Sequence, residues 1–137
     1  MNKKLLIIGG SSNLGRNFIP LLKNIHQSTY FNNKIIDGIH FNILQDDISK
    51  KININDYSAV LLLSAITNPE TCIKNKDYSN LLNVISLKKI IKFLIGHRIK
   101  IIFFSTEFIY DGKKGNYNEK DFPNPINLYG SQKYNIE

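Results

Sequence analysis

Apolar residues occur along the chain in short runs of strand length, separated by longer segments with a different spacing. A continuous apolar run of about four to eight residues between turn residues is typical of a strand buried on both faces of a sheet. Other short runs are enriched in β-formers or alternate apolar and polar residues, as in a partly buried strand. The pattern predicts strands at residues 4–8, 28–31, 39–44, 59–63 and 99–104.

Two longer segments carry apolar residues at every third or fourth position, which predicts helices over residues 14–25 and 81–94. Pro20 falls inside the first segment, and we expect it to kink or shorten that helix because proline has no N–H to donate. Gly96 follows the second segment, where a glycine is expected to act as the C-cap.

The segments between the later strands are more polar. Residues 66–76 are expected to form a loop, or a short helix broken by Pro69. Residues 112–125 carry glycine, asparagine and two prolines, which indicates a loop. A last helix is predicted to begin near Leu128. Strands that alternate with helices predict an α/β fold with a doubly wound parallel sheet.

The composition is that of a globular protein and excludes several classes. The 137 residues are 42% hydrophobic and 11% aromatic, and no apolar run is long enough to cross a membrane. The formal net charge is +7, but the lysines are spread along the chain without a basic and aromatic cluster, so we expect no nucleic-acid binding. The single cysteine, Cys72, and the lack of a signal segment predict a cytoplasmic protein. No metal site is expected.

The first predicted strand ends in the turn sequence GGSSNLG, residues 9–15. Glycines let a backbone approach a phosphate group closely, and the amides at the start of the following helix favour an anion. A strand, a glycine turn and a helix in this order are typical of a dinucleotide-binding domain. The spacing alone is also compatible with an ordinary turn that binds nothing.

Polar side chains follow the other predicted strands as well. They are Asp46-Asp47, Ser64-Ala65 and Ser105-Thr106-Glu107. Ligands of open α/β sheets bind outside the carboxyl ends of the strands, so these segments are expected to meet in one crevice.

Tyr129 and Lys133 are four residues apart on the last predicted helix and therefore share one face of it. A nearby ammonium group is expected to lower the pKa of a phenol, because it stabilises the phenolate. Such a tyrosine can pass a proton to a carbonyl oxygen. Thr106 is a candidate for steadying the same oxygen.

These motifs together resemble the extended short-chain dehydrogenase/reductase superfamily, over nearly the whole chain and in order. GGSSNLG resembles the Gly-x-x-Gly-x-x-Gly turn of that family, with Ser12 in place of the middle glycine. Asn83-Val84 resembles the Asn-Val pair of the helix before the fifth strand. STEFIYDG resembles the segment with the catalytic hydroxyl, and YGSQK resembles the Tyr-x-x-x-Lys motif.

The resemblance implies a Rossmann-type sheet in three α/β/α layers and a set of functional residues. The implied catalytic residues are Thr106, Tyr129 and Lys133. The implied contacts to the cofactor, NAD or NADP, come from Gly9, Ser12, Asn13, Leu14, Gly15, Asp47, Ile48, Ser64, Ala65, Tyr129 and Lys133. Asp47-Ile48 resembles the pair that contacts adenine. No acidic residue ends the second strand, and Lys34 stands where a lysine accepts a 2′-phosphate, so both cofactors remain open.

STEFIYDG most resembles the sugar-nucleotide reductases of the superfamily, which implies reduction of a nucleotide-linked 4-keto sugar and a role in cell-surface polysaccharide synthesis. Phe108 replaces the second acid of the 4,6-dehydratases, which disfavours that reaction. A sugar-nucleotide epimerase and a non-catalytic nucleotide-binding module remain alternatives, and a homodimer is among the options for assembly. Residues 1–137 are interpreted as an incomplete NAD(P)-binding domain without its substrate-binding part, with an exposed apolar sheet edge.

Overall fold

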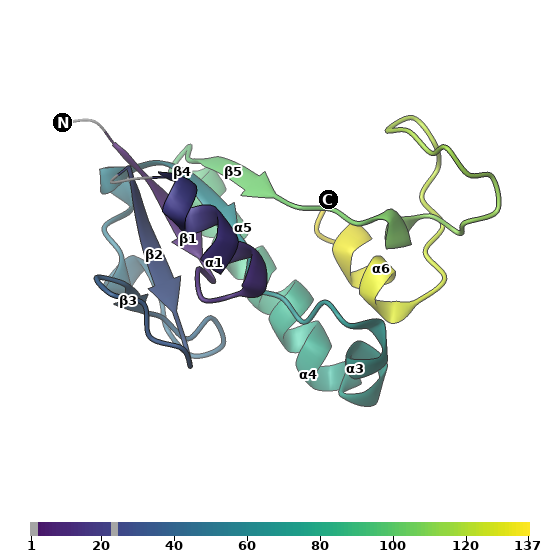
Figure 1. Ribbon diagram of the computed structural model, residues 1–137, viewed down its shortest axis with the longest axis horizontal. Helices are drawn as coiled ribbons and strands as arrows, with labels where there is room; N and C mark the ends of the chain where they lie inside the picture. The colour runs from purple at the N-terminus through teal and green to yellow at the C-terminus, as the bar shows by residue number, and fades with distance from the viewer. Residues whose placement is uncertain (1–2, 23–24) are drawn as a thin grey trace. The chain divides into compact units, whose positions relative to one another are not determined.

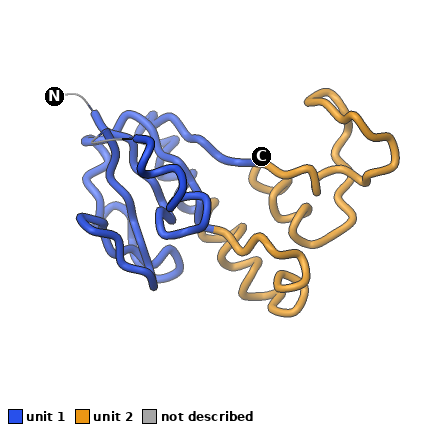
Figure 2. Tube along the Cα trace, in the orientation of Figure 1, with its two compact units in different colours: residues 1–64, 89–104 blue, residues 65–88, 105–137 orange. Residues whose placement is uncertain are grey.

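A computed structural model describes residues 3–22 and 25–137 of the chain. The residues fall into two compact units (Figure 2). The first unit, called the sheet unit, comprises residues 1–64 and 89–104. The second, called the helical unit, comprises residues 65–88 and 105–137.

The sheet unit is built on five parallel strands, which confirms the predicted α/β fold with a parallel sheet (Figure 1). Their order across the sheet is β3-β2-β1-β4-β5. The central strands are buried because both of their faces are apolar, and Leu6, Ile7 and Ile8 are all 0% exposed. The strands are β1 (Lys4–Ile8), β2 (His26–Tyr30), β3 (Ile39–His40), β4 (Tyr57–Leu62) and β5 (Lys100–Phe103).

Helices cover both faces of this sheet, as the predicted three-layer arrangement requires (Figure 1). The connection through α1 (Asn13–Phe18) steps from β1 outward to β2, and the connection through α5 (Leu87–Gly96) steps from β4 outward to β5. Right-handed crossovers that step in opposite directions place their helices on opposite faces. Strand β5 lies at one edge of the sheet, where Ile102 and the following Phe104 are exposed.

The first predicted helix is shorter than expected. Helix α1 ends at Phe18, and a 3₁₀ turn, η1 (Ile19–Leu22), follows it. Pro20 lies in this turn and cannot donate the hydrogen bond that would continue the α-helix. Residues 23–24 of the predicted helix lie outside the described residues.

The third strand is also shorter than predicted, because a turn begins at Asn42. The Asn42 side chain accepts a hydrogen bond from the Leu44 amide (3.0 Å), and the Asp46 carboxylate accepts one from the Asn42 amide (2.7 Å). Such side-chain bonds compete with a strand ladder. The chain then forms α2 (Ile48–Lys51) and the 3₁₀ turn η2 (Ile54–Asp56) before β4.

The end of α5 differs from the prediction for Gly96. Gly96 is the last helical residue, and Arg98 adopts the left-handed conformation, with φ of 55°. The Ile99 amide donates to the Leu94 carbonyl and the Arg98 amide donates to the Ile95 carbonyl, both at 3.0 Å. This is the Schellman pattern, so Arg98 terminates the helix.

The helical unit contains α3 (Pro69–Lys74), α4 (Lys76–Asn80), the π-helical turn η3 (Leu81–Ser86), the 3₁₀ turn η4 (Glu107–Ile109) and α6 (Leu128–Tyr134). Pro69 does not break a helix: it opens α3 at the first position, where proline is favoured, and Asn68 caps it by accepting from the Thr71 amide (2.8 Å). The helix predicted over residues 81–94 does not begin at residue 81, because η3 continues directly from α4. None of the described helices is long and apolar enough to span a membrane.

Candidate functional site

The turn after β1 is hydrogen-bonded to β2 and packs closely against the end of β4. The Gly9 amide donates to the Thr29 hydroxyl (3.0 Å), and the Gly10 amide donates to the Thr29 carbonyl (2.9 Å). Gly9 has φ of +87°, and a Cβ there would lie 2.7 Å from the amide nitrogen of Ser64. Only glycine fits this conformation beside Ser64, so the structure brings the turn and the end of β4 together.

Ser12, which departs from the glycine of the motif, acts as the N-cap of α1. Its hydroxyl accepts a hydrogen bond from the Gly15 amide (3.1 Å). A Cβ on Gly15 would lie 2.7 Å from the Gly10 carbonyl carbon, so the helix starts directly against the turn. Asn13 and Leu14 are the first two helical residues, whose amides have no partner four residues earlier in the helix.

Asp47 and Ile48 have local structural roles at the start of α2. The Asp47 carboxylate accepts hydrogen bonds from the Ser49 hydroxyl (2.7 Å) and the Ser49 amide (3.0 Å), and these bonds lower the pKa of Asp47. The Ile48 side chain is buried. Asp47 is exposed, so its carboxylate is accessible while it caps the helix.

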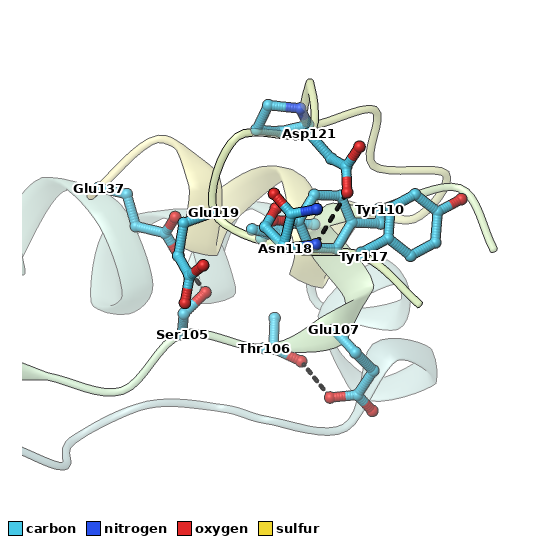
Figure 3. Close-up of a pocket in the computed structure, with 11 residues that line it drawn as sticks. Ser105, Thr106, Glu107, Tyr110, Tyr117, Asn118, Glu119, Asp121 and Glu137 are labelled. Atoms are coloured by element: carbon cyan, nitrogen blue, oxygen red, sulfur yellow. Dashed lines mark hydrogen bonds between the residues drawn. The ribbon is translucent and has the colours of Figure 1, made fainter. Parts of the chain in front are cut away.

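Thr106 lines a cavity of about 590 Å³ in the helical unit (Figure 3). Its hydroxyl accepts a hydrogen bond from the Phe108 amide and donates one to the Glu107 carboxylate, both at 3.3 Å. Tyr110 and Tyr117 form another wall of the cavity, with their rings stacked at 4.4 Å between centroids. The remaining lining is mostly polar: Ser105, Asn118, Glu119, Asp121 and Glu137, with Ile109 and Pro123.

Tyr129 and Lys133 lie together on α6, as the sequence predicts. Tyr129 is only 6% exposed, and the Lys133 ammonium lies 5.9 Å from the centroid of its ring. The expected lowering of the phenol pKa is wrong for this structure. Burial raises the pKa of Tyr129, and electrostatic interactions with the neighbouring Cys72 and Glu107 add to the rise. Burial also lowers the pKa of Lys133.

Helix α6 packs closely against η4, the turn that follows Thr106. A Cβ on Gly130 would lie 2.7 Å from the carbonyl carbon of Phe108. The rings of Phe108 and Tyr129 meet edge to face, with centroids 6.1 Å apart. The glycine of YGSQK therefore brings the Thr106 segment and the Tyr129 helix into contact.

The candidate residues thus fall into two sets, one in each unit. Gly9, Ser12, Asn13, Leu14, Gly15, Asp47, Ile48 and Ser64 belong to the sheet unit, whereas Ala65, Thr106, Tyr129 and Lys133 belong to the helical unit. Residues 3–22 and 25–137 hold no cluster of histidine, cysteine and acidic side chains suited to a metal ion.

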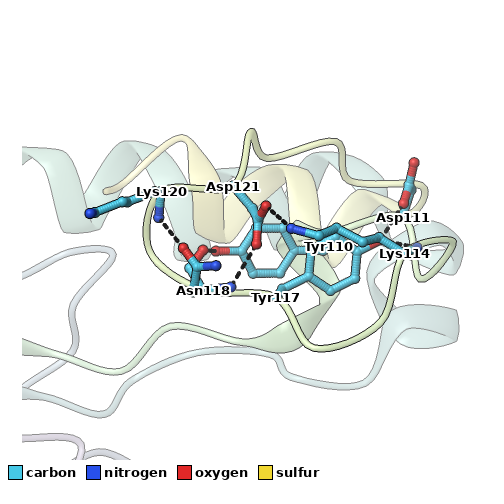
Figure 4. Close-up of polar contacts among 7 residues, drawn as sticks. All are labelled: Tyr110, Asp111, Lys114, Tyr117, Asn118, Lys120 and Asp121. Atoms are coloured by element: carbon cyan, nitrogen blue, oxygen red, sulfur yellow. Dashed lines mark hydrogen bonds and ion pairs between the residues drawn. The ribbon is translucent and has the colours of Figure 1, made fainter.

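Two features of the helical unit have little signal in the sequence. The first is a buried hydrogen-bonded chain through Ser79, Gln132 and Asn83. Its only sequence signal is a glutamine on the same helical face as Tyr129. The second is the loop 110–124, which the sequence predicts only as a polar connection but which is held together by polar contacts between its side chains (Figure 4).

Asp111 organises the loop 110–124. Its carboxylate accepts hydrogen bonds from the Tyr117 hydroxyl (2.6 Å), the Lys113 amide (3.1 Å) and the Asn124 side chain (3.1 Å). These bonds lower the pKa of Asp111 from 3.8 to about 2. On the other side of the loop, Asp121 forms an ion pair with Lys114.

We expect this loop to loosen in acid. A carboxyl group whose pKa is lowered by folding stabilises the loop fully above pH 3.8, and this stabilisation is lost as the pH falls toward about 2. The side-chain amide signal of Asn124, followed by NMR, should shift in this range. Asp111→Asn should abolish the shift and Asp121→Asn should retain it. A shift that persists in Asp111→Asn would contradict the assignment.

Comparison with known proteins places the chain in a family. The family described as RmlD substrate binding domain matches residues 3–137. Methionine adenosyltransferase 2 subunit beta from Xenopus tropicalis is 29% identical over 92 residues, which cover 66% of this chain and 28% of that protein. dTDP-4-dehydrorhamnose reductase from Aggregatibacter actinomycetemcomitans is 25% identical over 143 residues, which cover 95% of this chain and 44% of that protein. The chain therefore spans less than half the length of these relatives.

Solved structures share the fold. A hypothetical dTDP-4-dehydrorhamnose reductase from Sulfolobus tokodaii has a TM-score of 0.85 at 28% identity, over 97% of this chain and 50% of that chain. The Bacillus anthracis reductase solved with NADP has a TM-score of 0.80 at 22% identity, over 99% of this chain and 48% of that chain. MoeE5 solved with UDP-glucose and NAD has a TM-score of 0.84 at 17% identity, over 97% of this chain and 46% of that chain. The Rossmann-like fold is thereby confirmed, and the match over residues 3–137 shows that the chain belongs to the RmlD substrate binding domain family.

Proposed function

We propose that this chain is the NAD(P)-binding part of an oxidoreductase that reduces a nucleotide-linked 4-keto sugar. The family match and the reductase among the relatives support the general class. The observation that carries the proposal is the pairing of a buried Tyr129 with Lys133 on a helix packed against the Thr106 segment. A role in cell-surface polysaccharide synthesis is part of the proposal, as the pathway class that uses such sugars.

The turn after β1 fits a dinucleotide. Gly9 and Gly15 let the turn pack directly against Ser64 and Gly10, where a Cβ would clash, and this gives the tight strand-to-helix turn of a dinucleotide site. The amides of Asn13 and Leu14 are left to hold its pyrophosphate, because the Gly15 amide is bound to Ser12. In this proposal Asp47 and Ile48 contact the adenine, and Ser64 and Ala65 lie beside the dinucleotide.

The bound NADPH or NADH would supply a hydride to the carbonyl carbon of the sugar. Tyr129 donates its phenolic proton to the carbonyl oxygen, so the product is an alcohol. Lys133 stabilises the phenolate that remains and holds a ribose hydroxyl of the cofactor. Thr106 donates a hydrogen bond to the same oxygen and thereby orients the carbonyl group.

The cavity lined by Thr106 is the proposed place of the sugar, with the carbonyl group directed toward Tyr129, which does not itself line the cavity. Its volume of about 590 Å³ is within the range of small-molecule sites. Hydroxyl, amide and carboxylate groups line it, and these can bind the hydroxyl groups of a sugar. The stacked Tyr110 and Tyr117 offer apolar ring surface for the C–H groups of the same sugar.

The first experiment separates binding from catalysis. The 137-residue chain is titrated with NAD(H) and NADP(H) by calorimetry, and the protein expressed from its complete reading frame is assayed with a nucleotide-linked 4-keto sugar. Stoichiometric oxidation of NAD(P)H supports the reductase. Conversion of a sugar without net oxidation of NAD(P)H would instead support the epimerase.

A second candidate function is an accessory nucleotide-binding subunit without catalysis. The observation in its favour is that the relative from Xenopus tropicalis is named as a subunit of methionine adenosyltransferase 2. Tight binding of NADP(H) without turnover of any keto sugar would support this alternative.

Light scattering of the same sample tests whether the chain forms a homodimer.

Lys34 is expected to select between the two cofactors. It is exposed just after β2, where a positive charge can accept the 2′-phosphate of NADP. Reversing its charge in Lys34→Glu should weaken binding of NADPH about tenfold and leave NADH nearly unchanged. Calorimetric titrations of both cofactors measure this difference.

The matched control for this prediction is Lys92→Glu, which changes an exposed lysine of α5 and gives the same net charge. It should leave both affinities unchanged. Equal weakening of NADPH and NADH binding by Lys34→Glu would contradict the role of Lys34.

A further inference from the structure

Gln132 is a buried polar residue on α6 that the proposed chemistry does not use. It is 3% exposed and lies one residue before Lys133. Its side-chain oxygen accepts a hydrogen bond from the Asn83 amide group (2.8 Å), and its side-chain nitrogen donates one to the Ser79 hydroxyl (2.9 Å). Both ends of this amide are therefore satisfied inside the helical unit.

The chain of hydrogen bonds continues from both partners to the backbone. Asn83 holds Ile66 at both backbone groups: it accepts from the amide (2.8 Å) and donates to the carbonyl (2.9 Å). The Ser79 hydroxyl lies 3.0 Å from the carbonyl oxygens of Cys72 and Lys76. This Asn83–Gln132–Ser79 chain thus connects α6 to α3, α4 and η3.

A short helix needs such contacts to keep its orientation. Helix α6 has seven residues, which is too few for a stable isolated helix. Tyr129 and Gln132 are three residues apart and therefore lie on one face, one turn from each other. Ser131 and Tyr134 are exposed on the other side. The orientation of α6 about its axis determines where Tyr129 and Lys133 point.

Directional hydrogen bonds constrain this orientation in addition to the packing of Gly130 and Tyr129 on Phe108. Asn83 presents an N–H donor and Ser79 presents an acceptor oxygen, so the bridging side chain must accept at one end and donate at the other. A primary amide does both. If α6 rotated so that Lys133 faced these groups, its ammonium group could not accept the hydrogen bond from Asn83. Rotation in the other direction would bring Ser131, whose single hydroxyl oxygen cannot replace both the oxygen and the nitrogen of the amide.

We propose that Gln132 is a positioning residue for Tyr129 and Lys133. It holds α6 in the one rotation that buries the phenol with the ammonium group beside its ring. The inference rests on the proposed function for its catalytic consequence, but the orientation of α6 can be tested without turnover.

The test replaces Gln132 by methionine, which has similar volume and helix propensity but no hydrogen bonds. Tyr129 is observed by NMR with carbon-labelled tyrosine, and its signal is assigned with Tyr129→Phe. In Gln132→Met the pKa of Tyr129 should fall toward the ordinary tyrosine value, because a loosened α6 admits water to the phenol. Hydrogen exchange at the Ser131 and Asn135 amides should become about tenfold faster.

The matched control is Tyr134→Met, which changes an exposed residue two positions further along α6. It should leave the pKa of Tyr129 unchanged. A second variant, Ser79→Ala, lies outside α6 and removes the partner of the Gln132 side-chain nitrogen, together with the hydroxyl contacts to the Cys72 and Lys76 carbonyls. It should shift the pKa of Tyr129 in the same direction by a smaller amount, and it serves as the test if Gln132→Met fails to fold.

An unchanged Tyr129 titration in folded Gln132→Met or in Ser79→Ala would overturn the inference. If the titration shifts while the unsubstituted protein reduces no keto sugar, the positioning role stands and the proposed function fails. If the protein is a reductase, Gln132→Met should lower kcat about tenfold with little change in KM, because a misplaced acid weakens the transition state more than substrate binding.

Discussion

Tyr129→Phe should reduce turnover of the proposed reductase by a factor of about 10² to 10⁴, the usual contribution of a positioned general acid. The variant keeps the aromatic ring, so the edge-to-face contact with Phe108 and the burial of the ring near the start of α6 are retained. We therefore expect unchanged thermal stability and an NAD(P)H affinity that falls by less than the turnover, because Tyr129 is also one of the implied cofactor contacts. Steady-state kinetics of the protein from its complete reading frame, with calorimetry of the cofactor, measure both quantities.

The matched control is Tyr134→Phe, which removes a phenolic hydroxyl from an exposed residue of the same helix. It should leave kcat unchanged. Undiminished turnover in folded Tyr129→Phe would contradict the role of Tyr129 as the acid.

Gly130→Ala should destabilise the helical unit and displace Tyr129. The new Cβ would lie 2.7 Å from the Phe108 carbonyl carbon, and this neighbour is backbone that cannot move aside by changing rotamer. Forcing an extra methyl group into such a contact costs about 1–3 kcal/mol of unfolding free energy. Chemical denaturation followed by tyrosine fluorescence measures the change, and turnover should fall because α6 carries both Tyr129 and Lys133.

Gly96→Ala is the control, and it should change the unfolding free energy in the opposite direction. Gly96 is helical at the end of α5, and a Cβ there meets no atom within 4 Å. Alanine should raise the unfolding free energy by about 0.5–1 kcal/mol, because glycine loses more backbone entropy in a helix. A Gly130→Ala protein as stable as the unsubstituted chain would contradict the close packing of α6 on η4.

The sheet could be predicted well because its signals are local. Strand β1 has the predicted bounds, because its apolar run has strand length and ends directly at the glycine turn. Strand β3 is shorter than predicted, because the alternation of apolar and polar residues continues past the point where Asn42 and Asp46 form a turn. The prediction of a helix broken at Pro69 is wrong, because the fixed φ of proline suits the first position of α3.

The candidate site could be predicted in its residue types but not in its supporting contacts. The motif places Tyr129 and Lys133 on one helical face, and the structure shows this arrangement. The sign of the shift in the Tyr129 pKa depends on burial by residues distant in sequence, which spacing cannot reveal. The partners of Gln132 are 49 and 53 residues away in sequence, so the Asn83–Gln132–Ser79 chain needed a structure to be found.

The most direct test of the central claim is transfer of a labelled hydride. The protein from its complete reading frame is incubated with NADPH or NADH deuterated at the transferable position and with a nucleotide-linked 4-keto sugar, and the product is examined by mass spectrometry and NMR. We predict one deuterium at carbon 4 of the reduced sugar and one oxidised cofactor for each product molecule. Cofactor binding with no deuterium transferred, or conversion without net oxidation of the cofactor, would contradict the proposed reductase.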